Sequence, residues 1–159
     1  MVGGVCASSS EIARKMSKVT DNAADNMRTK YQEIRSDEDP TCWAAFAYDG
    51  KLLEEEGKSG DDLADFLECC QDDNRVFGYL RFETGDEMSR RAKFALITWI
   101  GPAVGALKKA AVSTDKAFVK EIWKQFGKEF LSDEKKDLNL DKIKADLEKS
   151  SGAAYGTGK

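Results

Sequence analysis

One stretch, residues 85–101, limits what this chain can fold into more than any other. Its first half is a polar, glycine-containing loop that ends in three close cations, Arg90, Arg91 and Lys93. Its second half, residues 94–100, is a run of apolar and β-forming residues with almost no polar interruption. The run is too short to cross a membrane, and its Thr and aromatic content and the glycines at both ends favour a strand buried on both faces over a buried helix segment. A charged loop is therefore expected to sit directly on the centre of a sheet.

Hydrophobic periodicity and turn residues divide the rest of the chain into helices and strands. Helical spacing begins near residue 11 and stops before Pro40, in one piece or two, with Thr20 and Asp21 available as caps for a second piece. A turn at Asp49 and Gly50 joins strands over 42–48 and 51–54 into a hairpin. The later elements expected are a loop over 55–60, a helix opened by Asp61 and Asp62, a strand over 75–84, a helix with Val119, Ile122, Trp123 and Phe126 on one stripe, an edge strand over 129–131 and a helix over 138–149.

Hairpins mixed with helices predict an α+β fold, with a sheet layered between helices, and not a doubly wound parallel sheet. The length of 159 residues suits one domain of ordinary size. We expect residues 1–18 to form a partly flexible N-terminal extension, 19–149 to form the domain, and the Gly/Ala-rich residues 150–159 to form a flexible tail.

The charge of the chain is unevenly distributed. The net charge of −4 argues against a non-specific nucleic-acid binder. Residues 54–73 carry nine Asp and Glu against one Lys, whereas residues 86–128 carry nine Lys and Arg against four Asp and Glu. An acidic molecule with one basic sector suits an acidic protein partner better than a polyanion. Neither a nucleic acid nor a membrane is expected as a partner.

The residue types also limit the chemistry. The chain has no histidine, which removes the commonest general base and metal ligand. Of four cysteines, the adjacent Cys69 and Cys70 have the wrong spacing for a zinc pair. We therefore expect no catalytic residue, no metal site and no cofactor. The thiols should be reduced, in a cytosolic protein, with Cys42 and Cys69 acting as small buried hydrophobic residues.

Several motifs together resemble the coactosin branch of the actin-depolymerising factor homology (ADF/cofilin) family. The resemblance covers about residues 25–155, and its longest and most specific part is the core from Ser89 to Gly101. The motifs that carry it are FAYDG (46–50), DDNRVF (72–77), RFETGD (81–86), MSRRAKFALITWIG (88–101), TDK (114–116), VKE (119–121), KEF (128–130) and GAAY (152–155).

The resemblance implies a five- or six-stranded mixed sheet between two pairs of helices, and no enzymatic activity. We expect the protein to be a monomer. The resemblance also implies a cytoplasmic, cytoskeletal protein that binds the side of filamentous actin without severing it. In this family the contact falls on the basic hairpin loop with the strand start, and on the beginning of the long helix. Carried over to this chain, the actin-binding residues are Lys93, Arg90, Arg91, Lys108, Lys109 and Lys116.

One departure from the cofilin pattern bears on function. Cofilin-type members open the long helix with a Lys-x-Lys-Met type pattern, whereas this chain has Lys108, Lys109, Ala110 and Ala111 with no methionine following. This weakens the case for severing and for binding monomeric actin. A cofilin-like monomer binder and depolymeriser, and an adaptor that stabilises a partner enzyme, stay open as alternatives. The serines at 8–10 faintly resemble the cofilin N-terminus, where a serine is phosphorylated.

Overall fold

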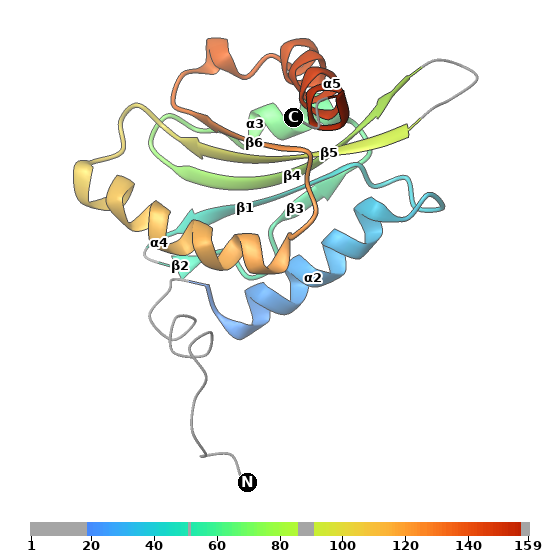
Figure 1. The fold of residues 1–159 in the computed structure, drawn as a ribbon. Coiled ribbons are helices and arrows are strands. Elements are labelled where there is room, and N and C mark those ends of the chain that lie inside the picture. Colours follow the sequence, from blue (N-terminus) through green and yellow to red (C-terminus); the bar gives the residue numbers. More distant parts are fainter. Residues whose placement is uncertain (1–18, 51, 86–90, 157–159) are drawn as a thin grey trace, which may run out of the picture.

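The fold is a six-stranded sheet with helices on both faces (Figure 1). The structure is a computed structural model that describes residues 19–50, 52–85 and 91–156. Its elements in chain order are α2 (Asp21–Arg35), β1 (Trp43–Asp49), β2 (Leu52–Leu53), β3 (Lys58–Gly60), α3 (Leu63–Glu68), β4 (Arg75–Thr84), β5 (Arg91–Ile100), α4 (Ala106–Ile122), β6 (Lys128–Ser132), the 3₁₀ helix η1 (Lys135–Asp137) and α5 (Leu140–Gly156). The predicted α+β domain with a mixed central sheet is confirmed.

The centre of the sheet is the antiparallel pair of β4 and β5. The strand order is β2-β1-β4-β5-β6, with β3 paired to β1. The β4–β5 pairing runs without a break from Arg75 opposite Ile100 to Thr84 opposite Arg91. Only β6 is parallel to its neighbour, which makes the sheet mixed, since β5 and β6 are joined through α4.

Each face of the sheet is covered by two helices, because β4 and β5 are apolar on both sides. Side chains alternate along a strand, so Tyr79 and Leu96 enter the core beneath α2 and α4, whereas Leu80 and Ile97 enter the core beneath α3 and α5. Figure 1 shows these helix pairs on opposite sides of the sheet. The three tryptophans are buried in these cores: Trp43, Trp99 and Trp123.

The predicted boundaries hold for several elements and fail for others. Thr20 caps α2, accepting a hydrogen bond of 3.1 Å from Ala23 N. The helix predicted to open at Asp61 and Asp62 is α3, which begins after its cap Asp62. The predicted loop over 55–60 contains a strand, β3, since backbone pairing with β1 recruits residues 58–60 without any hydrophobic pattern of their own. Residues 1–18, including the serines at 8–10, lie outside the described residues.

The last two helices differ most from the sequence expectation. α4 starts at Ala106 and stops at Ile122, so that Trp123 is its C-terminal cap and Phe126 follows it in a loop. The apolar stripe predicted from Val119 to Phe126 therefore continues past the end of the helix. α5 runs to Gly156, beyond the predicted boundary at 149.

Burial affects the thiols of the three cysteines that the structure describes. Cys42, Cys69 and Cys70 are all free. The predicted burial is wrong in degree, since Cys42 and Cys69 are half-buried and Cys70 is the fully buried one. Burial raises the pKa of the Cys42 thiol to about 11 and that of Cys70 to about 12. Both thiols therefore stay protonated near neutral pH, and thiols in that form are poor nucleophiles.

A buried polar cluster fastens α4 to the sheet. The hydroxyl of Tyr48 on β1 donates a hydrogen bond to the carboxylate of Asp115, a residue of α4 that is only 1% exposed. The guanidinium of Arg75 lies 3.7 Å from the centre of the Tyr48 ring and donates a 3.2 Å hydrogen bond to the carbonyl oxygen of Lys108. Since a buried polar group is costly to leave without its partner, this cluster fixes where the first turns of α4 lie.

Removing the Tyr48 hydroxyl should therefore destabilise the fold. We expect Tyr48→Phe to lower the free energy of unfolding by about 1–3 kcal/mol, because the buried Asp115 carboxylate loses a donor while the ring keeps its packing. Urea denaturation measures this loss. In a double-mutant cycle with Asp115→Asn the two losses should not add; additive losses would show that the two side chains do not stabilise one another.

Candidate functional site

The hairpin end of β4 and β5 carries the first group of predicted site residues. Arg91, the first residue of β5, is exposed and lies opposite Thr84, whose hydroxyl donates a 3.2 Å hydrogen bond to the Arg91 carbonyl oxygen. Lys93 is half-buried and lies opposite Phe82. Both cations belong to the strand itself and not to the loop in which the sequence analysis placed Arg91. Arg90 lies outside the described residues.

The second group, at the start of α4, is at the other end of the sheet. Lys108 and Lys109 are exposed in the first turns of α4, next to Arg75. Arg75 pairs with Ile100, the last residue of β5, whereas Lys93 is near its first. Seven residues of extended strand span roughly 23 Å. Figure 1 shows the hairpin and the first turn of α4 at opposite ends of the sheet.

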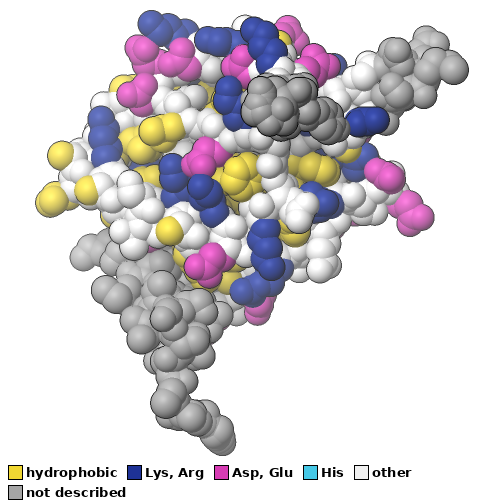
Figure 2. Space-filling view, in the orientation of Figure 1, with side chains coloured by type: hydrophobic (Ala, Val, Ile, Leu, Met, Phe, Trp, Pro, Cys, Tyr) yellow, Lys and Arg dark blue, Asp and Glu magenta, His cyan; other side chains and the backbone are white. Residues whose placement is uncertain are grey.

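The predicted cations thus form two separate patches. We call Arg91 and Lys93 the hairpin patch, and Lys108 and Lys109 the helix patch. Figure 2 shows Lys and Arg side chains scattered across this side of the molecule, over α4 and on towards the hairpin. A single small ligand could not touch both patches, but an extended macromolecular surface could.

Lys116, the sixth predicted residue, is engaged within the protein. Its ammonium lies 2.9 Å from a carboxylate oxygen of Glu129 on β6, and the Lys120 ammonium lies 2.7 Å from the other oxygen. Lys116 and Glu129 are each about one-quarter exposed, at 26% and 28%. These hydrogen bonds and charges hold the pKa of Glu129 below its ordinary value. The bridge ties α4 to the edge strand and cancels part of the positive charge of Lys116 and Lys120.

Beside the hairpin patch lies a basic hollow that the sequence analysis did not predict. It has a volume of about 440 Å³ and is formed by the end of α2, the first half of β5 and the loop after α4. Among the described residues that line it, three are cations and none is a carboxylate: the cations are Arg35, Lys93 and Lys124. Arg35 gave no signal in the sequence, since only the packing of α2 against the sheet brings it near Lys93.

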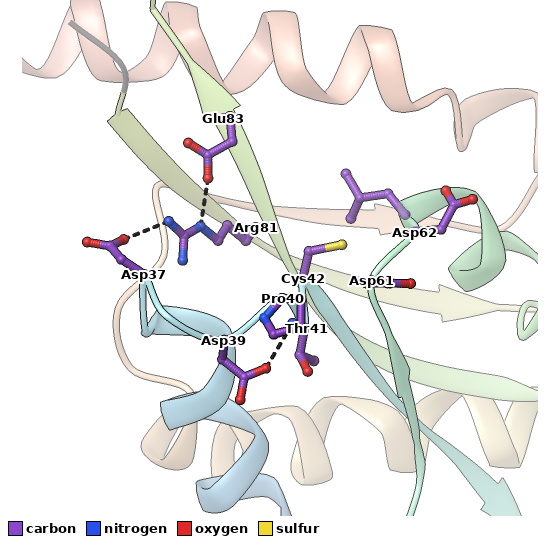
Figure 3. Close-up of a pocket in the computed structure, with 10 residues that line it drawn as sticks. Asp37, Asp39, Pro40, Thr41, Cys42, Asp61, Asp62, Arg81 and Glu83 are labelled. Carbon is purple, nitrogen blue, oxygen red and sulfur yellow. Dashed lines mark hydrogen bonds and ion pairs between the residues drawn. The ribbon is translucent and has the colours of Figure 1, made fainter.

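A second hollow, of about 450 Å³, has the opposite charge (Figure 3). Its carboxylates are Asp37, Asp39, Asp61, Asp62 and Glu83. Its cation, Arg81, is held by ion pairs of 2.7 Å to Asp37 and 2.9 Å to Glu83 and donates to the carbonyl oxygens of Ile34 and Ser36. This acidic cleft adjoins the hairpin patch, because Glu83 lies opposite Ala92 in the β4–β5 ladder.

A further group of carboxylates lies around η1. Within the described residues, the group of carboxylates closest to a metal-ligand arrangement is Asp133, Glu134 and Asp137, and all three are exposed. Glu134 is also ion-paired with Lys136 at 3.3 Å. Among the helices of the described part of the chain, none combines the length and apolarity that a membrane span needs.

Comparison with known proteins gives one consistent result. Residues 20–148 match the family described as cofilin/tropomyosin-type actin-binding protein. The chain is 46% identical to the coactosin-like protein of Bos taurus over 128 residues, which are 80% of this chain and 89% of the relative. A crystal structure of human coactosin-like protein superposes with a TM-score of 0.75 at 42% identity, covering 84% of this chain and 98% of the human one.

A solution structure of mouse coactosin gives a similar match. Its TM-score is 0.70 at 40% identity, over 90% of this chain and 98% of the mouse chain. The mouse protein is described as an actin filament binding protein.

The Glu129 bridge makes a pH-dependent contribution to stability that can be measured. Because its pKa is lowered in the folded state, the contribution is complete above the ordinary value of 4.5 and is lost as pH falls through the folded value. We expect Glu129→Gln to cost about 1 kcal/mol in urea unfolding at pH 7 and less at pH 3. Glu148→Gln, an exposed change on α5, is the control. An equal cost of Glu129→Gln at both pH values would contradict the ion-pair account.

Proposed function

Because the chain belongs to the cofilin/tropomyosin-type family of actin-binding proteins, and within it to the coactosins, we propose that it binds the side of filamentous actin through its two basic patches. It is an actin-binding protein and not an enzyme. The observation that carries the proposal is the match over nearly the whole of mouse coactosin, described as an actin filament binding protein. Lys93 lies near the start of β5, which is where the family resemblance locates the filament contact.

The hairpin patch is the stronger half of the proposed contact. Arg91 and Lys93 lie on a ten-residue strand paired along its whole length with β4, so their backbone is rigid. With Arg90 they offer cations to the acidic surface of actin. Complementary charge at a rigid site raises the association rate and fixes the register of the complex more than it raises affinity.

The helix patch gives the second half. Lys108 and Lys109 are exposed, and the hydrogen bond from Arg75 to the Lys108 carbonyl oxygen fixes the turn that carries them. Since the patches lie at opposite ends of the sheet, we propose that each meets a different part of the filament, on one or two neighbouring actin subunits. Lys116 lies between the two patches on α4. Its ion pair with Glu129 reduces the positive charge that it can offer to actin.

We propose that binding leaves the filament intact. In the first turns of α4, the sequence Lys108, Lys109, Ala110, Ala111 lacks the Lys-x-Lys-Met type pattern of cofilin-type members. The protein would act by occupying the filament side, where it would compete with depolymerising or capping factors. This role needs no cofactor or bond chemistry.

Charge reversal at each patch tests the proposed contact. We expect Lys93→Glu to weaken co-sedimentation with filamentous actin roughly tenfold or more, because a carboxylate would face an acidic surface. Lys109→Glu, more exposed, should weaken it about twofold to fivefold. Raising the salt concentration should weaken the wild type as well, since screening shortens charge interactions to about 10 Å at 0.1 M.

Lys58→Glu is the matched control for these variants, because Lys58 is exposed on β3, which pairs with β1 and lies away from β5. It should pellet like the wild type. Wild-type protein that stays in the supernatant at every salt concentration would refute filament binding. Equal binding by Lys93→Glu and the wild type would remove the hairpin patch from the contact.

The absence of severing is tested separately. When pyrene-labelled filaments are diluted below the critical concentration, we expect the protein to leave the rate of fluorescence loss unchanged or to slow it. Accelerated loss would instead support the cofilin-like depolymeriser.

A further inference from the structure

We infer that the basic hollow beside the hairpin patch is an anion-accepting part of the actin-binding surface, anchored by Arg35 and extended by Lys124. The anions it would take are the carboxylates of an acidic segment of actin. This inference rests on the proposed filament binding and adds two contact residues to it. Both lie outside the motif that runs from Met88 to Gly101.

Arg35 is held in place before any partner arrives. Its guanidinium lies 4.8 Å from the centre of the Phe94 ring and 5.3 Å from that of Tyr31. Its Nη1 donates to the Tyr79 hydroxyl at 3.3 Å and to the Gln125 carbonyl oxygen at 3.5 Å. A guanidinium has five N–H donors, so these contacts orient the group and leave donors on its other nitrogens.

The loop that carries Lys124 is anchored by the same residues. The Tyr79 hydroxyl donates to the Gln125 carbonyl oxygen, and the Gln125 N–H donates to the Tyr31 hydroxyl at 3.1 Å. The Gly127 N–H donates to the Phe94 carbonyl oxygen at 2.7 Å. Burial raises the pKa of Tyr79, so its hydroxyl stays a neutral donor across the physiological range. The loop beside Arg35 that carries Lys124 is therefore fixed.

The edge of β5 adds a backbone donor to the hollow. β6 begins to pair with β5 only at Ala95, so the first part of β5 has β4 on one side and the hollow on the other. Phe94 turns its carbonyl oxygen away from β4, towards Gly127. Alternate residues of an antiparallel strand point their backbone groups the same way, so the N–H of Ala92 is directed to the hollow as well.

The charge of the hollow selects an anionic partner. Among the described residues, Arg35, Lys93 and Lys124 line it without a carboxylate, and no Asp or Glu forms an ion pair with Arg35 or Lys124. Guanidinium and carboxylate match in a planar, two-bond geometry. Lys93 belongs to the hairpin patch and also lines the hollow. An actin segment that reaches Lys93 would therefore place its carboxylates within reach of Arg35.

Neutralising the two added cations tests the inference. We expect Arg35→Gln to weaken co-sedimentation with filamentous actin roughly tenfold, as loss of a charge-assisted hydrogen bond implies. Lys124→Gln should weaken co-sedimentation about twofold to fivefold. Binding by both variants should also depend less on salt concentration than binding by the wild type. The matched control is Arg28→Gln, the same change on the same helix, at an arginine that pairs with Asp25 at the surface.

A second readout distinguishes direct contact from a structural effect of Arg35. Carbodiimide treatment joins a lysine ammonium to a carboxylate in contact with it, so we expect mass spectrometry to find Lys124 linked to an acidic actin peptide. Lys124 is exposed, so its variant should fold even if Arg35→Gln proves unstable in thermal unfolding.

The possible outcomes separate the two proposals. If Lys93→Glu weakens binding while Arg35→Gln and Lys124→Gln bind like Arg28→Gln, and Lys124 forms no crosslink, filament binding stands and the role of the hollow is refuted. If the wild type does not pellet with filaments, both are refuted. Weakening by Lys124→Gln together with its crosslink establishes the hollow as part of the contact.

Discussion

The unbroken pairing of β4 with β5 is the constraint on which the rest of the structure depends. It joins ten residues of each strand, and both strands are apolar on both faces, so the sheet must be covered on both sides. Close packing on one side requires Gly78, because a Cβ there would lie 2.3 Å from a ring carbon of Phe66 on α3. The same pairing carries Lys93 at one end of β5 and fixes the start of α4 beyond the other end.

Hydrogen bonds from buried aromatic residues and Arg75 hold the covering elements in register. The indole N–H of Trp123 donates to the Met27 carbonyl oxygen at 3.0 Å, which links the end of α4 to α2. On the other face, the indole N–H of Trp99 donates to the Gln71 carbonyl oxygen at 2.7 Å. Together with the hydrogen bond from Tyr48 to Asp115, these bonds fix the positions of the helices, whereas apolar burial alone would allow the helices to slide.

The distribution of charge on the surface would favour one orientation of a bound partner. The acidic cleft around Arg81 and the basic hollow around Arg35 adjoin the same end of the β4–β5 hairpin. An acidic partner would be attracted to one and repelled by the other, so the pair would favour one orientation of the complex. Arg81 itself has no role as a ligand for such a partner, since Asp37 and Glu83 already hold it.

The strands of the hairpin, the cap at Thr20 and the family could be predicted from the sequence, because each depends on local periodicity or on a continuous motif. The sequence did not reveal β3, whose residues form a strand only because β1 offers an edge to pair with. It also could not show that the predicted cations form two patches, that Lys116 is bridged to Glu129, or that Arg35 stands beside Lys93. Those are relations between residues distant in the chain, and only the packing of helices against the sheet decided them.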